Sequence, residues 1–139
     1  MVGRNAWWLV GAWLLTGCPC GREDSTIAYD GGTAEAGTYQ SSSWQGPWLH
    51  FPGGRRYLLA HHLGEAPASV SVYLSFKESP GPGSNSDDQP GNASQAAGNE
   101  TVIEQVDAQH IQVRNDTCSD FFLRVVARAG TTVADAGTD

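Results

Sequence analysis

Strict alternation of apolar and polar side chains over residues 69–77 constrains the fold of this chain more than any other feature. The apolar positions are Val70, Val72, Leu74 and Phe76, and Ser or Tyr separates them. Successive side chains on a β-strand point to opposite faces, so a period of two predicts a strand with one buried face. We expect these four apolar residues to face the core.

A second segment, Phe121 to Arg128, repeats the alternation. Its predicted inward face consists of Phe121, Leu123, Val125 and Ala127. The opposite face mixes apolar residues with two arginines, Arg124 and Arg128, and we expect it to be partly covered. Four shorter segments are further strand candidates: Trp48–Phe51, Tyr57–Leu63, Thr101–Val106 and His110–Asn115.

Three turn signals separate these candidates. Pro52-Gly53-Gly54 follows the first of them, and Asp107-Ala108-Gln109 predicts a hairpin. Residues 115–120 link the last two strands and place Cys118 in a surface turn. No segment carries the 3.6-residue stripe of an amphipathic helix. The sequence therefore predicts an all-β fold, a single small antiparallel β-sandwich of about six strands.

An apolar run at residues 6–15 ends in the tetrapeptide Leu15-Thr16-Gly17-Cys18. The run has ~10 residues, which suits a secretory signal and falls short of the ~20 that span a bilayer. The tetrapeptide resembles the lipobox of bacterial lipoproteins. This resemblance implies that residues 1–17 are a cleaved signal peptide and that acylation of Cys18 anchors the exported protein. It also implies the outer membrane rather than the inner one, because Pro19 replaces the Asp that often retains lipoproteins at the inner membrane.

Composition divides the rest of the chain into three parts. Residues 18–42 are poor in apolar side chains, and we predict a lipidated N-terminus followed by a flexible tether. Residues 43–129 contain the alternating segments and are the predicted β-sandwich domain. Within it, residues 79–99 form a low-complexity loop that is either functional or disordered, and its composition favours disorder. Residues 130–139 are predicted to be a disordered tail.

The charge of the chain argues against one class of partner. The sequence has 8 Lys and Arg against 15 Asp and Glu, a formal net charge of −7. Loss of Arg4 with the signal leaves 7 against 15, or −8. Nucleic acid is therefore not an expected partner, because phosphate neutralisation needs clustered basic residues. Anionic lipid would not attract this surface either, so the acyl chains would hold the protein to its membrane.

Three cysteines become two once Cys18 carries lipid. Cys20 and Cys118 are then an even pair in an oxidising compartment, and we predict a disulfide between them. The bond would close a loop of about 100 residues, which is worth roughly 4.7 kcal/mol in the chain-entropy model. The alternative is two free thiols.

The four histidines are candidate metal ligands. His61 and His62 are adjacent, so on a strand their side chains would point to opposite faces and could not share a small site. No pair has the short spacing of a zinc site, and no Gly-x-Ser-x-Gly elbow marks a nucleophile. We predict no cofactor, no metal site and no catalytic residue. The rival hypothesis is an envelope enzyme with a converging His/Asp site that includes His50, His61 or His110.

Trp44, Trp48, Arg55 and Arg56 form the predicted contact patch. Aromatic side chains beside arginines supply stacking surface and hydrogen bonds for a carbohydrate or protein ligand. The alternative is that Trp48 belongs to the core and Trp44 covers the edge of the sandwich. The exposure of the two tryptophans distinguishes these two interpretations.

Residues 57–72 contain a strand candidate, the turn His61-His62-Leu63-Gly64-Glu65-Ala66-Pro67, and then an alternating strand. This order is similar to an element of H-type lectins and phage tail-fibre tips. The resemblance implies a small antiparallel sandwich, commonly trimeric, that binds sugars or caps a fibre. The insertion at residues 79–99 departs from the compact pattern of those families.

These observations predict a lipid-anchored cell-envelope lipoprotein whose β-sandwich does non-catalytic binding or structural work. A lectin-like, carbohydrate-binding module is the first alternative, and the envelope enzyme is the second. The predicted partners are the membrane through the anchor, a carbohydrate or an envelope protein, and further copies of the chain in a homotrimer.

Overall fold

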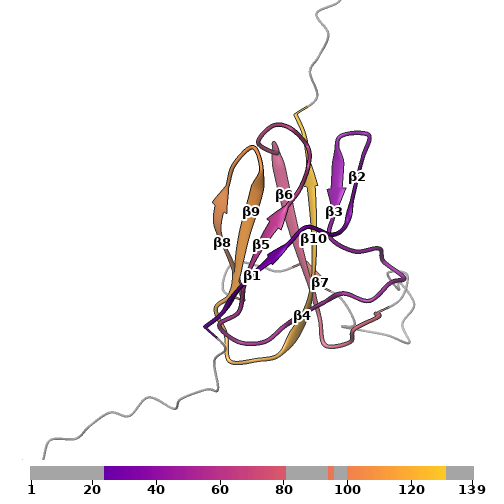
Figure 1. The fold of residues 1–139 in the computed structure, drawn as a ribbon. Coiled ribbons are helices and arrows are strands. Elements are labelled where there is room, and N and C mark those ends of the chain that lie inside the picture. The colour runs from indigo at the N-terminus through magenta and orange to yellow at the C-terminus, as the bar shows by residue number, and fades with distance from the viewer. Residues whose placement is uncertain (1–23, 81–93, 96–99, 131–139) are drawn as a thin grey trace, which may run out of the picture.

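The computed structural model describes residues 24–80, 94–95 and 100–130. Over these residues the chain forms ten strands in two sheets, packed face to face, and no helix (Figure 1). The prediction of an all-β sandwich is confirmed. The expected number of strands, about six, was too low because several strands of two to four residues carry no alternation that a sequence can reveal.

The smaller sheet has four strands in the order β1-β5-β9-β8. Their bounds are Thr26–Tyr29 for β1, Arg56–Ala60 for β5, His110–Asn115 for β9 and Thr101–Val106 for β8. The pairs β5–β9 and β8–β9 are antiparallel, whereas β1 runs parallel to β5. The sandwich is therefore not wholly antiparallel, and its one described parallel pair involves a strand that lies before the predicted domain of residues 43–129.

The larger sheet has six strands, with β2-β3-β10-β6-β7 in order and β4 as a second neighbour of β10. Their bounds are Thr33–Glu35 for β2, Thr38–Gln40 for β3, Leu49–Phe51 for β4, Ser69–Ser75 for β6, Ser94–Gln95 for β7 and Phe121–Arg128 for β10. Strands β3 and β4 pair with opposite ends of β10, at residues 126–128 and 121–123. Residues 41–48 therefore leave the sheet as a loop between them.

The core lies between the two sheets and consists of the inward residues of β3–β6, β9 and β10. Every predicted inward residue of β10 is at most 6% exposed: Phe121, Leu123, Val125 and Ala127. On β6 the prediction holds for Val72 and Leu74, which are buried, and Val70 is half-buried. It was wrong for Phe76, which is 70% exposed. The strand ends at Ser75, whose hydroxyl accepts a hydrogen bond from the Lys77 N–H, so the alternation stops one residue earlier than the sequence indicates.

The predicted tether at residues 18–42 was wrong for its described part. Residues 26–40 contain β1, β2 and β3, which join both sheets. Tyr39 is 1% exposed, and Ile27 and Tyr29 pack against the core. Few apolar residues suffice here because each of these strands pairs with a strand of an existing sheet, β1 with β5 and β3 with β10. The sandwich domain thus begins well before residue 43.

Several predicted features lie outside the described residues: the signal peptide at 1–17, Cys18, Cys20, most of the 79–99 loop and the tail from residue 131. Of that loop, residues 94–95 form β7, which pairs with β6 through Tyr73 and Gln95. Within the described ranges, the structure holds no helix with the length and hydropathy needed to cross a bilayer.

The turn between β9 and β10 holds Cys118 at the surface, as predicted. Gly53 packs directly beneath it, and a Cβ atom at this glycine would lie 2.6 Å from the Thr117 carbonyl oxygen. The described chain begins at the same end of the sandwich. Thr26 of β1 pairs with Arg56 of β5, and Arg56 pairs with Arg114, which lies at the end of β9 just before the Cys118 turn.

Candidate functional site

The two predicted tryptophans contact each other, but they have different environments. Their ring centroids are 5.5 Å apart. Trp48 is 3% exposed, and its Nε1–H donates to the Ser43 carbonyl oxygen at 3.1 Å. Trp44 is half-buried. Trp48 is therefore a core residue, which is the alternative to its membership of the contact patch. Trp44 is the tryptophan that remains partly accessible at the surface.

The two predicted arginines do not join Trp44 in one cluster. Arg56 lies on β5 of the four-stranded sheet, where its Nε is 2.9 Å from Glu104 Oε2. Arg55 follows the turn at residues 52–54, and its Nη1 donates to the His50 carbonyl oxygen at 3.4 Å. Trp44 and these two arginines are close in the sequence but not in space, because Trp44 belongs to the 41–48 loop on the six-stranded sheet.

The arginine that lies over Trp44 is Arg124 of β10. Its Cζ is 4.2 Å from the Trp44 ring centroid and 5.7 Å from that of Tyr73. The two rings are themselves in contact, with centroids 5.1 Å apart in a T-shaped arrangement. A guanidinium over an aromatic face is attracted by the ring quadrupole. The outer face of the six-stranded sheet thus carries an ordered group of two rings and one cation.

Two hydrogen bonds hold the Arg124 guanidinium in place. Nε donates to the Ser42 carbonyl oxygen at 2.9 Å, and Nη2 donates to Gln40 Oε1 at 2.5 Å. The Val125 N–H donates to Ser41 Oγ at 2.9 Å, so the start of the 41–48 loop is fastened to β10 at the adjacent residue. Arg124 therefore anchors the loop that presents Trp44.

Arg124 is 2% exposed, yet both of its hydrogen-bond acceptors are neutral. It forms no ion pair with any carboxylate in the described ranges. Burial disfavours the charged form and lowers the pKa of this guanidinium, although arginine remains protonated at neutral pH. A buried charge without a counter-ion is unusual, because buried charges are normally paired.

A hollow of about 290 Å³ lies against this group. We call it the arginine hollow, and its lining residues are Thr38, Gln40, Trp44, Tyr73, Arg124, Val126 and Arg128. None of these is acidic. Glu35 on β2 lies opposite Thr38, which in turn lies opposite Arg128, and no ion pair joins the Glu35 carboxylate to Arg124 or Arg128.

Sequence reasoning missed Arg124, Arg128 and Tyr73 as members of the site. A signal was present, because the outward face of residues 121–128 was predicted to be partly covered. That prediction is confirmed, since Arg124 is buried on this face and Val126 is half-buried. What the sequence could not supply was the covering segment, which lies about 80 residues earlier in the chain.

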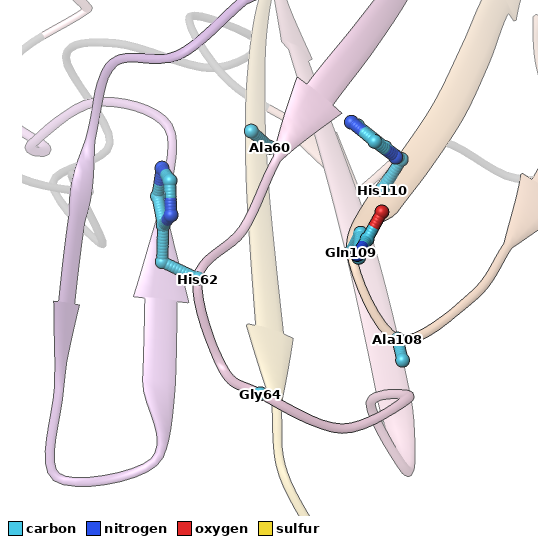
Figure 2. Close-up of a pocket in the computed structure, with 6 residues that line it drawn as sticks. All are labelled: Ala60, His62, Gly64, Ala108, Gln109 and His110. Carbon is cyan, nitrogen blue, oxygen red and sulfur yellow. The ribbon is translucent and has the colours of Figure 1, made fainter.

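Two of the four histidines line a second hollow, of about 410 Å³, at the end of β5 (Figure 2). His62 and His110 stand on its two sides, with Ala60 between them and Ala108 and Gly64 along its rim. None of the lining residues is a serine, cysteine or lysine. The hollow therefore offers imidazole groups but no side-chain nucleophile of these types.

Each histidine near this hollow already has a local partner. His61 is buried, accepts the Leu63 N–H at Nδ1 and donates from Nε2 to the Asp107 carbonyl oxygen at 2.9 Å. His62 Nε2 lies 2.5 Å from Asp30 Oδ1, and His110 Nδ1 lies 3.9 Å from Asp107 Oδ1. The Asp107 carboxylate accepts the N–H groups of residues 109 and 110, and these hydrogen bonds lower its pKa.

His50 is exposed on β4 and contacts Phe122, so it does not join the other histidines at this hollow. In the part of the chain that the structure describes, no group of three or more His, Cys, Asp or Glu side chains could hold a metal ion. Comparison with protein-family models, curated proteins and solved structures finds no match. The geometry of these residues is therefore the basis for assigning a function.

Proposed function

We propose that this protein is a lipid-anchored cell-envelope lipoprotein whose sandwich binds a ligand, without catalysis, at the outer face of the six-stranded sheet. The observation that carries the proposal is the group of Trp44, Tyr73 and Arg124 beside the arginine hollow. Tryptophan, tyrosine and arginine are the residue types that dominate binding energy at interfaces. Because hydrogen bonds already hold Arg124, a ligand would meet a surface that loses little conformational entropy on binding.

A carbohydrate is the ligand class that we favour within this proposal. The lining of the hollow combines two half-buried rings with the hydroxyl of Thr38 and the amide of Gln40. Aromatic surface with a few placed polar groups is typical of sites for small polar ligands. The likeness of residues 57–72 to an element of H-type lectins supports the same class, and it adds a homotrimer as the expected assembly.

The second hollow gives less support to the rival enzyme. His61 is buried and committed to main-chain partners, and His50 lies elsewhere. Only His110 of the three named histidines lines the hollow, and its nearest carboxylate is already bonded to main-chain N–H groups. A general base would need a substrate proton within reach and a partner that orients it.

The binding proposal is tested with the purified full chain and a panel of oligosaccharides, acidic and neutral. Tyr73→Ala is expected to weaken the binding of any saccharide that the protein retains by about tenfold or more, since it removes a ring from the hollow. Ile103→Ala is the matched control, because Ile103 is 42% exposed on β8 of the other sheet. Equal loss in both variants, or none in either, would place the binding surface elsewhere.

The lipid anchor rests on the Leu15-Thr16-Gly17-Cys18 tetrapeptide, with residues 1–17 as the cleaved signal and Cys18 as the acylated residue. Cys18→Ala is expected to release the protein from the membrane fraction and to remove the mass of the acyl chains from the intact protein. Retention in the membrane fraction with an unchanged mass would contradict the anchor. Sucrose-gradient separation of the two membranes tests the proposed outer-membrane location.

Chain geometry supports a disulfide between Cys20 and Cys118. The described chain begins at the same end of the sandwich as the Cys118 turn. Five residues lie between Cys20 and Thr26, so the six steps from one alpha carbon to the next can span about 20 Å when extended. Cys118→Ser is expected to destabilise the oxidised protein by about 2–4 kcal/mol, and to have no such effect under reducing conditions. Equal stability of the two proteins without reductant would contradict the bond.

A further inference from the structure

We infer that the arginine hollow is a subsite for an acidic saccharide, one whose carboxylate groups pair with Arg124 and Arg128. This inference rests on the proposed function and adds the charge of the ligand to it. It predicts that a positively charged site lies on a protein whose formal net charge is −7.

Arg124 is a buried cation without a carboxylate partner among the described residues. In the described ranges its guanidinium contacts two rings and donates to two neutral oxygen atoms. Neutral hydrogen bonds and ring contacts stabilise a guanidinium only in part, whereas a charged acceptor makes a stronger bond. An anion in the hollow would supply that acceptor in a partly desolvated place, where charge–charge attraction exceeds its value in water.

Arg128 lies four residues beyond Arg124 on β10, so both side chains project from the same face, with alpha carbons about 13 Å apart. Arg128 is exposed, and it forms no ion pair in the described part of the chain. The lining of the hollow therefore carries two positive charges, the buried one of Arg124 and the accessible one of Arg128. This spacing suits a ligand with repeated acidic groups.

The polar lining of the hollow favours a saccharide over an acidic peptide. Gln40 Oε1 accepts from Arg124, and this bond orients the amide so that its NH₂ group remains a donor. Thr38 adds a hydroxyl on the same strand. Half-buried Trp44 and Tyr73 add flat apolar surface. Hydroxyl groups and ring faces of a sugar would satisfy all three kinds of group at once.

The experiment is isothermal titration of the purified full chain with three probes of matched length: oligogalacturonate, a maltooligosaccharide and oligoglutamate. Oligogalacturonate is expected to bind and the neutral saccharide to bind at least about tenfold more weakly. Affinity for the acidic probe should fall when salt is raised from about 50 to about 500 mM, because screening weakens accessible ion pairs. Arg128→Gln should lower that affinity by about tenfold.

Arg56→Gln is the matched control, since it removes one positive charge from the other sheet. We avoid Arg124 as a test residue because it also holds the 41–48 loop. Equal losses for Arg56→Gln and Arg128→Gln would overturn the inference by showing a general charge effect. Equal or tighter binding of oligoglutamate would overturn the saccharide assignment.

A neutral saccharide that binds as well as the acidic one, and that depends on Tyr73, would overturn this inference but leave the proposed function intact. Absence of binding for all three probes would overturn the inference. The wider saccharide panel would then test the proposed function by itself, through its dependence on Tyr73.

Discussion

The outer faces of the two sheets differ in how their arginines are paired. On the four-stranded sheet, Arg56 and Arg114 share the Glu104 carboxylate at 2.9 and 2.6 Å, and Arg114 also pairs with Asp116. On the six-stranded sheet, Arg124 and Arg128 have no acidic partner in the described ranges, and aromatic rings surround Arg124 instead. Both arginines of the first face are thus paired with carboxylates, whereas the two of the second face are not paired within the described residues.

This difference indicates which face of the sandwich has charged groups left for a ligand. Paired charges on an exposed sheet are worth little to stability and have little left to offer a ligand. An arginine that is buried without a carboxylate has a desolvation cost that its neutral contacts offset only in part. Such a residue can be retained for what it binds as well as for what it holds in place.

The largest expected effect is on stability, from Arg124→Ala. This variant loses two charge-assisted hydrogen bonds and the contact with Trp44, so we expect a loss of about 2–4 kcal/mol in the free energy of unfolding. Arg114→Ala on the other face should cost less than about 1 kcal/mol. Urea denaturation followed by tryptophan fluorescence measures both. Equal costs would remove the contrast between the faces.

Arg124→Met sharpens the same comparison, because it keeps the length of the side chain and removes its charge. Replacing a buried charged group by an apolar one of similar volume is often neutral or stabilising. We expect this variant to be closer in stability to the wild type than Arg124→Ala. A cost as large as that of alanine would mean that the charge itself is needed to hold the loop.

The next effect concerns two adjacent serines in the loop that covers the six-stranded sheet. Ser41→Ala is expected to cost about 1–3 kcal/mol, since it leaves the buried Val125 N–H without its acceptor. Ser42→Ala should change stability by less than about 0.5 kcal/mol, because the buried Ser42 hydroxyl has no hydrogen-bond partner among the described residues. The same denaturation experiment compares the two. A reversed order would show that the loop is held differently.

The smallest effect depends on pH and belongs to the four-stranded sheet. Hydrogen bonds from Gln112, Arg56 and Arg114 lower the pKa of Glu104. A carboxyl group with a lowered folded-state pKa stabilises the fold above its unfolded-state pKa and loses that effect as pH falls through the folded value. Glu104→Gln should therefore cost less than about 1 kcal/mol near pH 7, and the difference should vanish in acid.

The matched variant for this pH series is Arg124→Ala, whose contacts in the described ranges include no carboxylate. Its cost should stay nearly constant as the pH falls from neutral into the acid range in which the Glu104 carboxyl becomes protonated. Thermal denaturation at several pH values measures both variants. A cost of Arg124→Ala that decreases in acid together with that of Glu104→Gln would reveal an acidic partner of Arg124.

Much of the fold could be predicted because long strands carry their own pattern. Residues 101–106, 110–115 and 121–128 form strands with the predicted bounds. The candidate at Tyr57–Leu63 is shorter in the structure, because β5 ends at Ala60 and His62 adopts a positive φ of 52°. Strands β1 to β3 were missed, since partners elsewhere in the chain stabilise them more than their own composition does.

The sequence by itself determined the all-β class, the inward residues of β10 and the turn that presents Cys118, because alternation and turn chemistry are local properties. Only the tertiary structure decided which arginine lies with Trp44. Proximity along the chain favours Arg55 and Arg56, but the register of β3 against β10 brings Gln40 and the following loop beside Arg124. Contacts of that kind depend on how distant strands pair, and no local pattern of residues specifies them.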